Sequence, residues 1–538
     1  MNDHTQESWK PLISIALTMT MVYITSFSIN VLISAIVGDL GTTVAHLQLV
    51  IVAASLIGGA LMVTAGRLGD KLGKKKVYVA GIVIYAIGLA LVVLSPNTTV
   101  FTVAWAVIWP AGMVLIIPTT VAMIMYYYQG TQRAVAFGIY GAVLSAVSAV
   151  APIVVGYLAS QIGWRPALAL SPIVGIIALL SALALDETDR DPSIKIDKPS
   201  VLLSVAGFGL FLIATTMAGT YGWILEKRPM AIAGTEVPLG GLSVVPVLFL
   251  VSVLLLVAFF LRGRTLSRKG DEPLLDATIL RNLPFTVGMS ITALFFLVNA
   301  GILFVVSVFL QAGAKFDSFA TALTTLPYTA CVAVFSLTTP KLGKRIPPKW
   351  ILVAGFAGMM AGTMMIGRTA STDMVPMDLL PGMLLLGIGS GFVMAQAGTV
   401  TMWTVKPEES GAASGLSETL KEILGQGFAV ALAGSILFGA VYGNMVREYE
   451  RIEGIELGEA ERQTIVIELE DTFQEITEAG EQEFIATLPD KTQQEYAAIV
   501  DRSAEGALRT TLWVMNVFIV VSLLLSLAVP GKRIEEGP

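Results

Sequence analysis

Hydrophobic residues occur in long unbroken runs along this chain, and short polar segments separate them. A helix needs about twenty apolar residues to cross the ~30 Å core of a bilayer. Fourteen runs reach that length, at residues 11–36, 45–65, 77–95, 99–125, 134–160, 165–186, 199–221, 241–261, 284–311, 318–338, 350–368, 377–402, 411–442 and 510–530. The pattern predicts fourteen transmembrane helices, and this even number returns the C-terminus to the side of the N-terminus.

Positive charges are divided unequally between the two sides of this topology. If the helices alternate in direction, one side holds 22 Lys and Arg residues, whereas the short loops of the other side hold five. The positive-inside rule puts the basic side, and with it both termini, in the cytoplasm. We therefore expect a multi-pass protein of the plasma membrane, surrounded by lipid.

The most basic turn lies between the second and third runs and reads GRLGDKLGKKKVYVAG, from Gly66 to Gly81. The pattern returns 274 positions later as PKLGKRIPPKWILVAG, with Lys344 in the place of Asp70. In many secondary transporters, two related halves build one substrate site at their interface. The same offset pairs spans one to six with spans nine to fourteen, so spans seven and eight form an insertion.

This arrangement predicts three parts: a six-helix bundle at residues 1–190, two inserted helices at 191–275, and a second six-helix bundle at 276–538. The second bundle also carries an insertion at about 443–508. Residues 446–510 include 17 acidic and 6 basic residues, and Pro489 interrupts them. We expect amphipathic helices outside the membrane, either as a solvated appendage or as a lid that attracts cations to the outer mouth.

Composition excludes several classes of protein. Hydrophobic residues make up 55% of the chain and the mean hydropathy is +0.76, which is too apolar for a soluble protein of this length. One cysteine, Cys331, excludes a disulfide framework, and two histidines leave little for a metal site. No phosphate-binding loop or catalytic triad is found. We expect no enzyme activity, cofactor, metal or nucleic-acid partner.

The basic turn resembles the signature loop of the major facilitator superfamily, through Gly66, Arg67, Gly69, Asp70, Gly73 and Lys74. The fourteen-span layout is similar to the drug:proton antiporter branch of that family. The resemblance implies an all-α major facilitator fold and a monomeric transporter that expels lipophilic drugs or related small molecules in exchange for protons, by alternating access. It also implies that Asp70 faces the positive N-terminal end of a neighbouring helix and locks the cytoplasmic gate in the outward-open state.

The fifth span partly matches the antiporter signature of the family, at Gly138, Ala151, Pro152 and Gly156. Small residues let helices approach closely, and a proline bends the span. Two customary groups are absent, because Ala106 stands where the family usually has an arginine and Thr25 where many relatives have an aspartate. These departures argue against the usual coupling mechanism and against a preference for strongly cationic drugs.

The remaining charges within a span are Glu418, Lys421 and Glu422, whose spacing allows them to share one helical face. They begin about 10 Å from the start of their span at Gly411, so both a membrane position and an interfacial position are open. Charges inside a bilayer are costly and usually functional. We expect proton coupling to depend mainly on Glu418, and less on Glu422 because Lys421 is its direct neighbour.

Aromatic and polar residues of several spans are candidates for the substrate cavity: Tyr23, Phe27, Asn30, Trp105, Trp109 and Tyr140, and in the second half Phe295, Phe296 and Tyr328. Such surfaces suit lipophilic substrates. Two alternatives remain open at this point. One is a facilitator or exporter of a specific metabolite or lipid, and the other is a non-transporting membrane receptor with the same fold.

Overall fold

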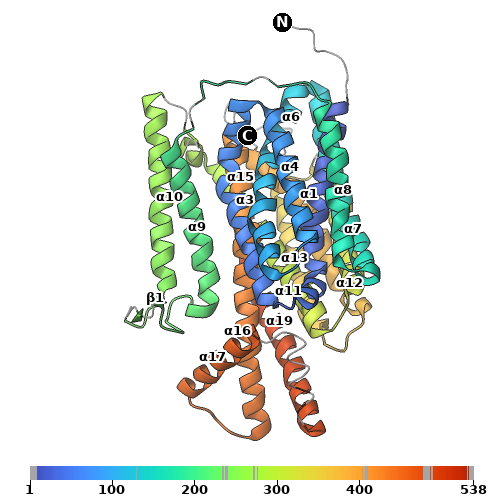
Figure 1. The fold of residues 1–538 in the computed structure, drawn as a ribbon, viewed down its shortest axis with the longest axis vertical. Helices are drawn as coiled ribbons and strands as arrows, with labels where there is room; N and C mark the ends of the chain where they lie inside the picture. Colours follow the sequence, from blue (N-terminus) through green and yellow to red (C-terminus); the bar gives the residue numbers. More distant parts are fainter. Residues whose placement is uncertain are drawn as a thin grey trace.

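The computed structural model describes residues 9–128, 130–188, 190–194, 196–232, 235–236, 240–270, 273–274, 277–343, 345–402, 404–405, 410–475, 485, 487, 489–529 and 531. Within these residues, fourteen helices are long and apolar enough to cross a membrane. This number confirms the prediction from the hydrophobic pattern. The first span begins and the last span ends at the same end of the molecule (Figure 1).

The first six spans form a bundle in which α1 packs on α7 and α8, and α4 packs between α6 and α8. Their elements are α1 (Lys10–Ser28), η1 (Ile29–Val31), α2 (Ile33–Leu40), α3 (Val44–Leu72), α4 (Lys74–Val93), α5 (Thr98–Val103), the π-helical η2 (Ala104–Ile108), α6 (Trp109–Tyr127), α7 (Gly130–Ile162) and α8 (Trp164–Leu183).

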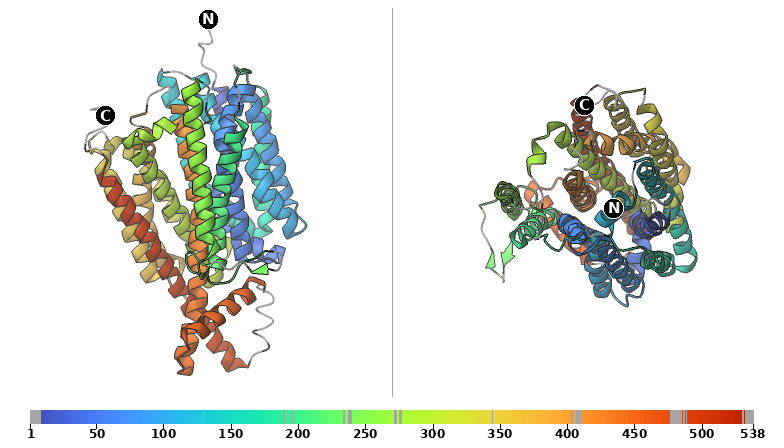
Figure 2. Two further views of the ribbon diagram at one scale, coloured as in Figure 1. Left: turned by 90° about the vertical axis from the view of Figure 1, so that its left-hand side faces the viewer. Right: turned by 90° about the horizontal axis from the view of Figure 1, so that it is seen from above.

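The next two spans, α9 (Lys198–Tyr221) and α10 (Val244–Lys269), stand side by side at the edge of the molecule (Figures 1 and 2). A short hairpin of β1 (Ala231–Ile232) and β2 (Thr235–Glu236) lies in the segment that joins them. At the other end, Asp197 caps α9 and binds Arg262 of α10 at 2.6 and 2.8 Å. The Arg262 guanidinium holds the pKa of the Asp197 carboxyl well below its usual range.

The last six spans form the second bundle, in which α14 packs on α12 and α13, and α11 packs on α14, α16 and α19. The elements are η3 (Ala277–Arg281), α11 (Leu283–Val308), the π-helical η4 (Phe309–Gly313), α12 (Ser318–Gly343), α13 (Pro348–Thr369), η5 (Pro376–Leu379), α14 (Leu380–Met402), α15 (Ser410–Glu422), the π-helical η7 (Ile423–Phe428), α16 (Ala429–Glu453), α17 (Glu459–Glu475) and α19 (Asp490–Leu527).

The two ends of the molecule differ in charge and shape. We call the end where α1 begins the basic end, because α4 starts there with Lys74, Lys75 and Lys76. We call the opposite end the acidic end, because α16, α17 and α19 project from it beyond the other helices (Figures 1 and 2). α9 packs on both α3 and α16, so the inserted pair contacts both bundles.

The projecting helices correct the predicted boundaries of the acidic insertion. The last span was expected to start near residue 510, but α19 begins at Asp490, directly after Pro489, and runs unbroken for 38 residues. α16 likewise continues to Glu453 instead of ending near residue 442. Neither α16 nor α19 contains a proline, so nothing in their sequences breaks the helix where the apolar residues give way to charged ones. Much of the insertion therefore consists of extended spans.

α17 connects this projecting part to the inserted helices. Glu470 is buried and accepts hydrogen bonds from Lys227 Nζ at 2.6 Å and Arg228 Nη2 at 3.2 Å, and Asp471 pairs with Arg228 as well. Both cationic residues follow the end of α9 at Tyr221. The acidic insertion is therefore attached to the segment between α9 and α10 and is more than a freely solvated appendage.

Candidate functional site

A cavity of about 410 Å³ lies between the two bundles. Spans from both halves contribute to its wall, mainly α1 and α7 from the first and α11, α12, α14 and α15 from the second. The predicted candidates that line it are Tyr23, Phe27, Asn30, Tyr140, Phe295, Phe296 and Tyr328. The wall is thus largely apolar and aromatic, with a few polar groups, which is typical of small-molecule sites.

Trp105 and Trp109 lie outside this lining, so their prediction as cavity residues is wrong for this conformation. Both are buried within the first bundle, and their rings stack at a centroid distance of 5.2 Å. Phe101 stacks on Trp105, and Tyr85 of α4 contacts Trp109. These aromatic residues pack α6 and η2 against α4 and do not face the opposite bundle.

Two pairs of polar residues face each other across the cavity. In the first bundle, the hydroxyls of Tyr23 and Tyr140 are 3.1 Å apart and link α1 to α7. In the second bundle, the Tyr328 hydroxyl donates to Asn299 Oδ1 at 2.5 Å and links α12 to α11. All four residues line the cavity, so each wall presents an internally bonded polar pair.

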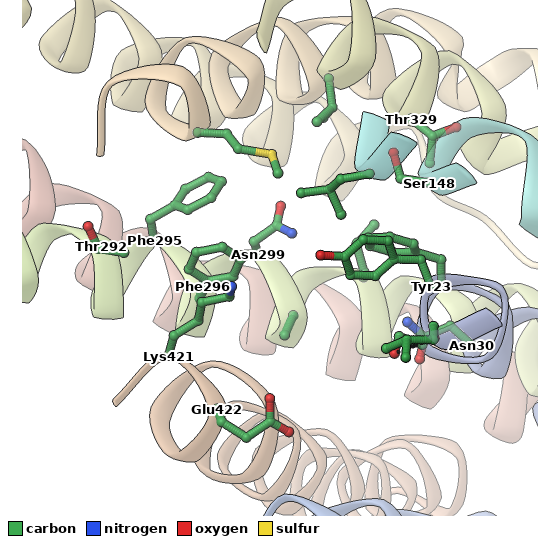
Figure 3. Close-up of a pocket in the computed structure, with 18 of the residues that line it drawn as sticks. Tyr23, Asn30, Ser148, Thr292, Phe295, Phe296, Asn299, Thr329, Lys421 and Glu422 are labelled. Atoms are coloured by element: carbon green, nitrogen blue, oxygen red, sulfur yellow. Dashed lines mark hydrogen bonds between the residues drawn. The ribbon is translucent and has the colours of Figure 1, made fainter. Parts of the chain in front are cut away.

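The charged residues of α15 also line the cavity, but their pairing differs from the expected one. Lys421 Nζ binds Glu418 Oε2 at 2.9 Å and lies 4.8 Å from the ring centroid of Phe296. Glu422 has no ion-pair partner within 4.0 Å among the described residues. Side chains at adjacent helical positions diverge, whereas positions i and i+3 are neighbours. Figure 3 shows Lys421 and Glu422 leaving their helix in different directions.

Glu422 lies deep in the bundle. A Cβ atom built on Gly58 of α3 would be 3.2 Å from both Cγ and Oε1 of Glu422, and one on Gly59 would be 2.2 Å from Ile423 Cγ1. Gly58 belongs to the candidate membrane span Val44–Met62 of α3 and lies four residues from the end of that span at Met62. The packing therefore puts Glu422 between the two bundles, beside the basic-end part of the α3 span.

The π-helical segment η7 follows Glu422 directly and packs closely on its neighbours. A Cβ on Gly425 would lie 2.6 Å from Phe296 Cβ, and one on Gly427 would lie 2.8 Å from Leu212 of α9. Such π-helical insertions are rare and frequently occur at functional sites. Here the insertion and two glycines let the helix with the charged residues contact α3, α9 and α11 together.

The acidic end of the cavity is closed by a glutamine from each bundle. Gln311 of η4 accepts hydrogen bonds from Ser34 N at 2.9 Å and Ser34 Oγ at 3.0 Å, and it donates to Asn30 O at 2.6 Å. Gln48 of α3 donates to Val430 O at 3.2 Å. Both amides are buried, so their bonds form in place of contacts with water.

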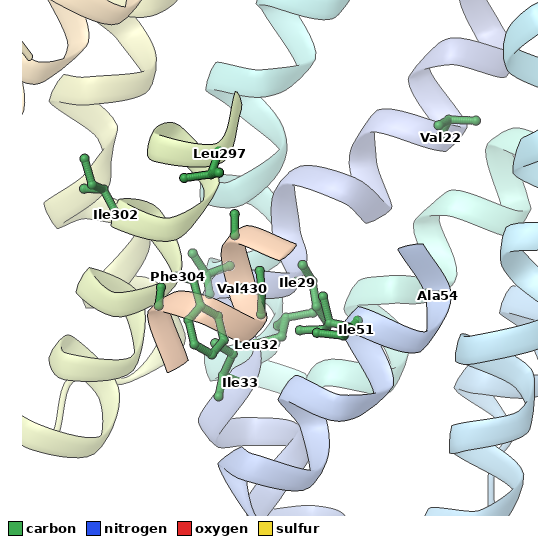
Figure 4. Close-up of a cluster of buried hydrophobic side chains, with 14 of the residues drawn as sticks. Val22, Ile29, Leu32, Ile33, Ile51, Ala54, Leu297, Ile302, Phe304 and Val430 are labelled. Carbon is green, nitrogen blue, oxygen red and sulfur yellow. The ribbon is translucent and has the colours of Figure 1, made fainter. Parts of the chain in front are cut away.

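Apolar side chains complete this closure (Figure 4). Ile29, Ile33 and Ile51 from the first bundle lie in one buried cluster with Phe304 and Val430 from the second. The close-up shows these side chains between the helices of the two halves. This packing supplies the apolar part of the contact between the two bundles at the acidic end.

The cavity extends toward the basic end instead. Its lining includes Met402, the last residue of α14, and Ser417, near the start of α15. At the acidic side, in contrast, the lining stops at residues such as Ile51 and Val430, which belong to the sealing cluster. The structure therefore represents a conformation whose cavity faces the basic end.

The signature loop lies at this basic end, and Gly73 alone separates α3 from α4. Its φ of 102° is a conformation that glycine adopts readily, which confirms the predicted tight turn. The Asp70 carboxylate binds Lys74 at 3.1 Å on the first turn of α4. Asp70 was expected to face the N-terminal end of a neighbouring helix, and that role stays a prediction. Residues 406–409, which precede the helix α15 at this end of the molecule, lie outside the described residues.

The remaining loop residues fasten the turn to other segments. Arg67 Nη2 donates to Pro273 O at 2.8 Å, in the segment before η3. The backbone N of Lys74 donates to Thr188 Oγ1 at 2.7 Å. A Cβ on Gly69 would be 3.1 Å from Thr119 of α6, and Gly66 lies beside the same helix. The loop thus connects α3 and α4 to the segment between α8 and α9 and to the segment between α10 and η3.

The antiporter-like residues of α7 occupy different surroundings. Pro152 lines the cavity, and a Cβ on Gly156 would be 2.7 Å from Ser318 O of α12, in the other bundle. Ala151 is buried but is not part of the cavity lining. Gly138 lies in α7, and its surroundings are outside the described side chains. Gly156 therefore permits a close approach of α7 to α12 in the second half.

Thr25 and Ala106, which replace customary charged residues, are both buried away from the cavity. Thr25 donates to Ser171 Oγ at 3.0 Å and thus ties α1 to α8 inside the first bundle. Ala106 belongs to η2. Neither position offers a titratable group.

Sequence reasoning did not identify Asn299, Gln311 or Gln48, although the structure gives each a distinct place. Asn299 and Gln311 are isolated polar residues near the middle and the end of a long apolar run. A polar side chain at membrane depth is costly and is a signal of function or of helix contacts. That signal was present in the sequence, but the partners of the amides could not be found without the fold.

Three comparisons with known proteins are informative. The sequence pattern of the Major Facilitator Superfamily matches residues 15–430. A probable actinorhodin transporter of Streptomyces coelicolor is 24% identical, over 94% of this chain and 89% of its own length. A puromycin resistance protein of Streptomyces alboniger is 26% identical, over 80% of this chain and 82% of its own length.

Solved structures share the architecture. A bacterial homolog of the human lysosomal transporter Spinster, in an inward-facing and occupied conformation, aligns with a TM-score of 0.59. The alignment covers 98% of this chain and 97% of that chain, at 13% sequence identity. At this low identity the similarity concerns the fold alone.

Proposed function

Because the chain belongs to the major facilitator superfamily, we propose that it is a plasma-membrane exporter of lipophilic small molecules that exchanges its substrate for protons by alternating access. It works as a monomer, with both termini in the cytoplasm. The observation that carries this proposal is the aromatic cavity between two bundles, with Glu418, Lys421 and Glu422 in its wall. Relatives that include a puromycin resistance protein support export of drug-like compounds.

The positive-inside rule assigns the basic end to the cytoplasm. The cavity of this conformation faces that end, so a substrate enters from the cytoplasm or the inner leaflet and binds between the Tyr23–Tyr140 pair and Phe295 and Phe296. Export then requires the contacts of Gln311 and Gln48 to open and the basic end to close. Asp70 and the signature loop are proposed to stabilise that second conformer.

Glu422 is proposed as the main coupling residue, because it can bind and release a proton without breaking an ion pair. Its side chain rests on Gly58, which belongs to the other bundle. When the bundles rock, the contact between α3 and α15 changes, and the hydration of this carboxylate changes with it. Glu418 holds Lys421 in place and is proposed to contribute less directly.

The test uses purified protein in proteoliposomes, with puromycin as the probe and an imposed proton gradient. Replacing Glu422 with Gln is expected to lower gradient-driven accumulation about tenfold or more, a range typical of coupling between sites, while downhill exchange persists. Glu418→Gln is expected to have a smaller effect on the same ratio. An internal pH dye measures proton movement in the same vesicles.

Glu459→Gln is a suitable control, since Glu459 lies on α17 with 72% of its side chain exposed. It is expected to pump as wild type does. If the Glu418→Gln, Glu422→Gln double variant pumps as well as wild type across a range of external pH, proton coupling through α15 is wrong. Probe movement without any proton flux in wild type would favour a facilitator instead.

A further inference from the structure

The second-bundle wall of the cavity holds one amide with a fixed orientation. Tyr328, which is buried, donates its single hydroxyl proton to Asn299 Oδ1 at 2.5 Å. The carbonyl oxygen of the amide therefore accepts from Tyr328, and Nδ2 is the atom that can donate. Among the described residues no acceptor is paired with this nitrogen. Asn299 lies in the middle of the cavity in Figure 3, so its N–H groups are available to a ligand.

The side chains that precede this amide on α11 give the wall an aromatic surface. Phe295 and Phe296 form an edge-to-face pair with ring centroids 5.2 Å apart. The ammonium of Lys421 lies over Phe296, and the nearby Glu418 carboxylate is engaged with that ammonium. This wall therefore offers ring surfaces and a hydrogen-bond donor side by side.

We propose that Asn299 determines the specificity of the cavity by selecting flat aromatic ligands that carry a carbonyl oxygen. This inference rests on the proposed function as an exporter of lipophilic small molecules. A ligand oxygen that accepts from Nδ2 replaces the water lost on binding, whereas a plain hydrocarbon leaves a desolvated N–H group unpaired. Sites built to hydrogen-bond a polar group discriminate strongly against analogues that lack it. Tyr328 acts as a positioning residue, because it fixes which end of the amide faces the ligand.

The experiment compares 9-fluorenone with fluorene, which share a three-ring skeleton and differ in one carbonyl oxygen. Binding to protein in lipid nanodiscs is measured by equilibrium dialysis, with empty nanodiscs subtracted. Wild type is expected to bind fluorenone about tenfold more tightly than fluorene, the effect of one satisfied hydrogen bond. Asn299→Leu is expected to abolish this preference while fluorene still binds.

Matched control variants are available elsewhere in the protein. Asn516 of α19 is buried, accepts from Thr363 Oγ1 at 2.7 Å and donates to Leu512 O, and it does not line the cavity. Asn516→Leu is expected to keep the tenfold preference. Tyr328→Phe, which frees the amide to turn, is expected to reduce the preference severalfold, whereas Tyr78→Phe, at a buried tyrosine outside the cavity, is expected to leave it unchanged.

The outcomes separate the two proposals. Equal binding of both ligands by wild type, or an undiminished preference in a monodisperse Asn299→Leu protein, overturns the role of Asn299 and leaves proton-driven export intact. An unchanged preference in Tyr328→Phe overturns the positioning role of Tyr328. The same variant tests the orientation of the amide if Asn299→Leu does not fold. Failure of wild type to bind either ligand overturns both the inference and a cavity for lipophilic aromatic compounds.

Discussion

Gln311 joins the two bundles through three hydrogen bonds, so its replacement by leucine is expected to open the acidic end. The bonds to Ser34 N, Ser34 Oγ and Asn30 O exist only while η4 lies against η1 and α2. Each buried hydrogen bond contributes about 1 kcal/mol to the net free energy. Losing three of them shifts the equilibrium between the two conformers by about 3 kcal/mol, or about a hundredfold in their ratio.

Pulsed electron paramagnetic resonance measures this shift directly. In a Cys331→Ser background, spin labels at Gly38→Cys and Asp373→Cys report the separation of the bundles at the acidic end, because both positions are exposed and belong to opposite halves. Gln311→Leu is expected to add a population with a longer label distance. Bound substrate and external pH are held constant, so that only the hydrogen bonds change.

Thr511→Val is the matched control, since the buried Thr511 hydroxyl donates only to Ala507 O within α19. It removes a buried hydrogen bond without touching the contact between bundles, and its distances are expected to match those of the unsubstituted protein. If Gln311→Leu gives the same distance distribution as Thr511→Val in folded, monodisperse protein, the amide does not hold the acidic end closed.

Two further predictions concern the signature loop and the contact that α17 makes with Arg228. Asp70→Asn is expected to reduce transport severely, whereas Lys74→Gln is expected to have a small effect. The reason is that Asp70 is proposed to stabilise the conformer with a closed basic end, and not to act through its ion pair with Lys74. Equal losses of transport in the vesicle assay would contradict this. Glu470→Gln is expected to lower the free energy of unfolding by about 1–3 kcal/mol, since it leaves the partly buried Arg228 with a weaker hydrogen-bond partner. Thermal unfolding that matches the exposed control Glu459→Gln would show that the contact contributes nothing.

The hydrophobic pattern predicted the fold well because the bilayer imposes a simple rule on it. A span must be about twenty apolar residues long, and the run from 318 to 338 corresponds almost residue for residue to the candidate span Ser318–Thr339. Outside the membrane that rule does not apply. The start of α19 was therefore misplaced by about twenty residues, because its charged first half is helical without being apolar.

The site was predicted only in part, since spacing gives the face of a helix but not its contacts. Lys421 adjoins Glu422 in sequence yet binds Glu418, because side-chain directions on a helix separate neighbours. Trp109 was expected in the cavity on its residue type, and the close approach of α4 at Gly88 holds it inside one bundle instead. Which side chains face the cavity depends on the rotation of each helix about its axis, and the sequence of an all-apolar span does not indicate that rotation.

The extended helix α19 has a mechanical consequence. Its 38 residues span ~57 Å, whereas the apolar core of a bilayer takes up about 30 Å, so roughly 27 Å of rigid rod stands outside. A rod fixed in the second bundle acts as a lever arm: rotation of that bundle by about 10° would sweep its tip through about 5 Å. Since α17 ties the neighbouring rod, α16, to the segment beside α9, any such swing also pulls on the inserted pair. A molecule that binds the projecting N-terminal end of α19 would then restrain the transport cycle without entering the cavity.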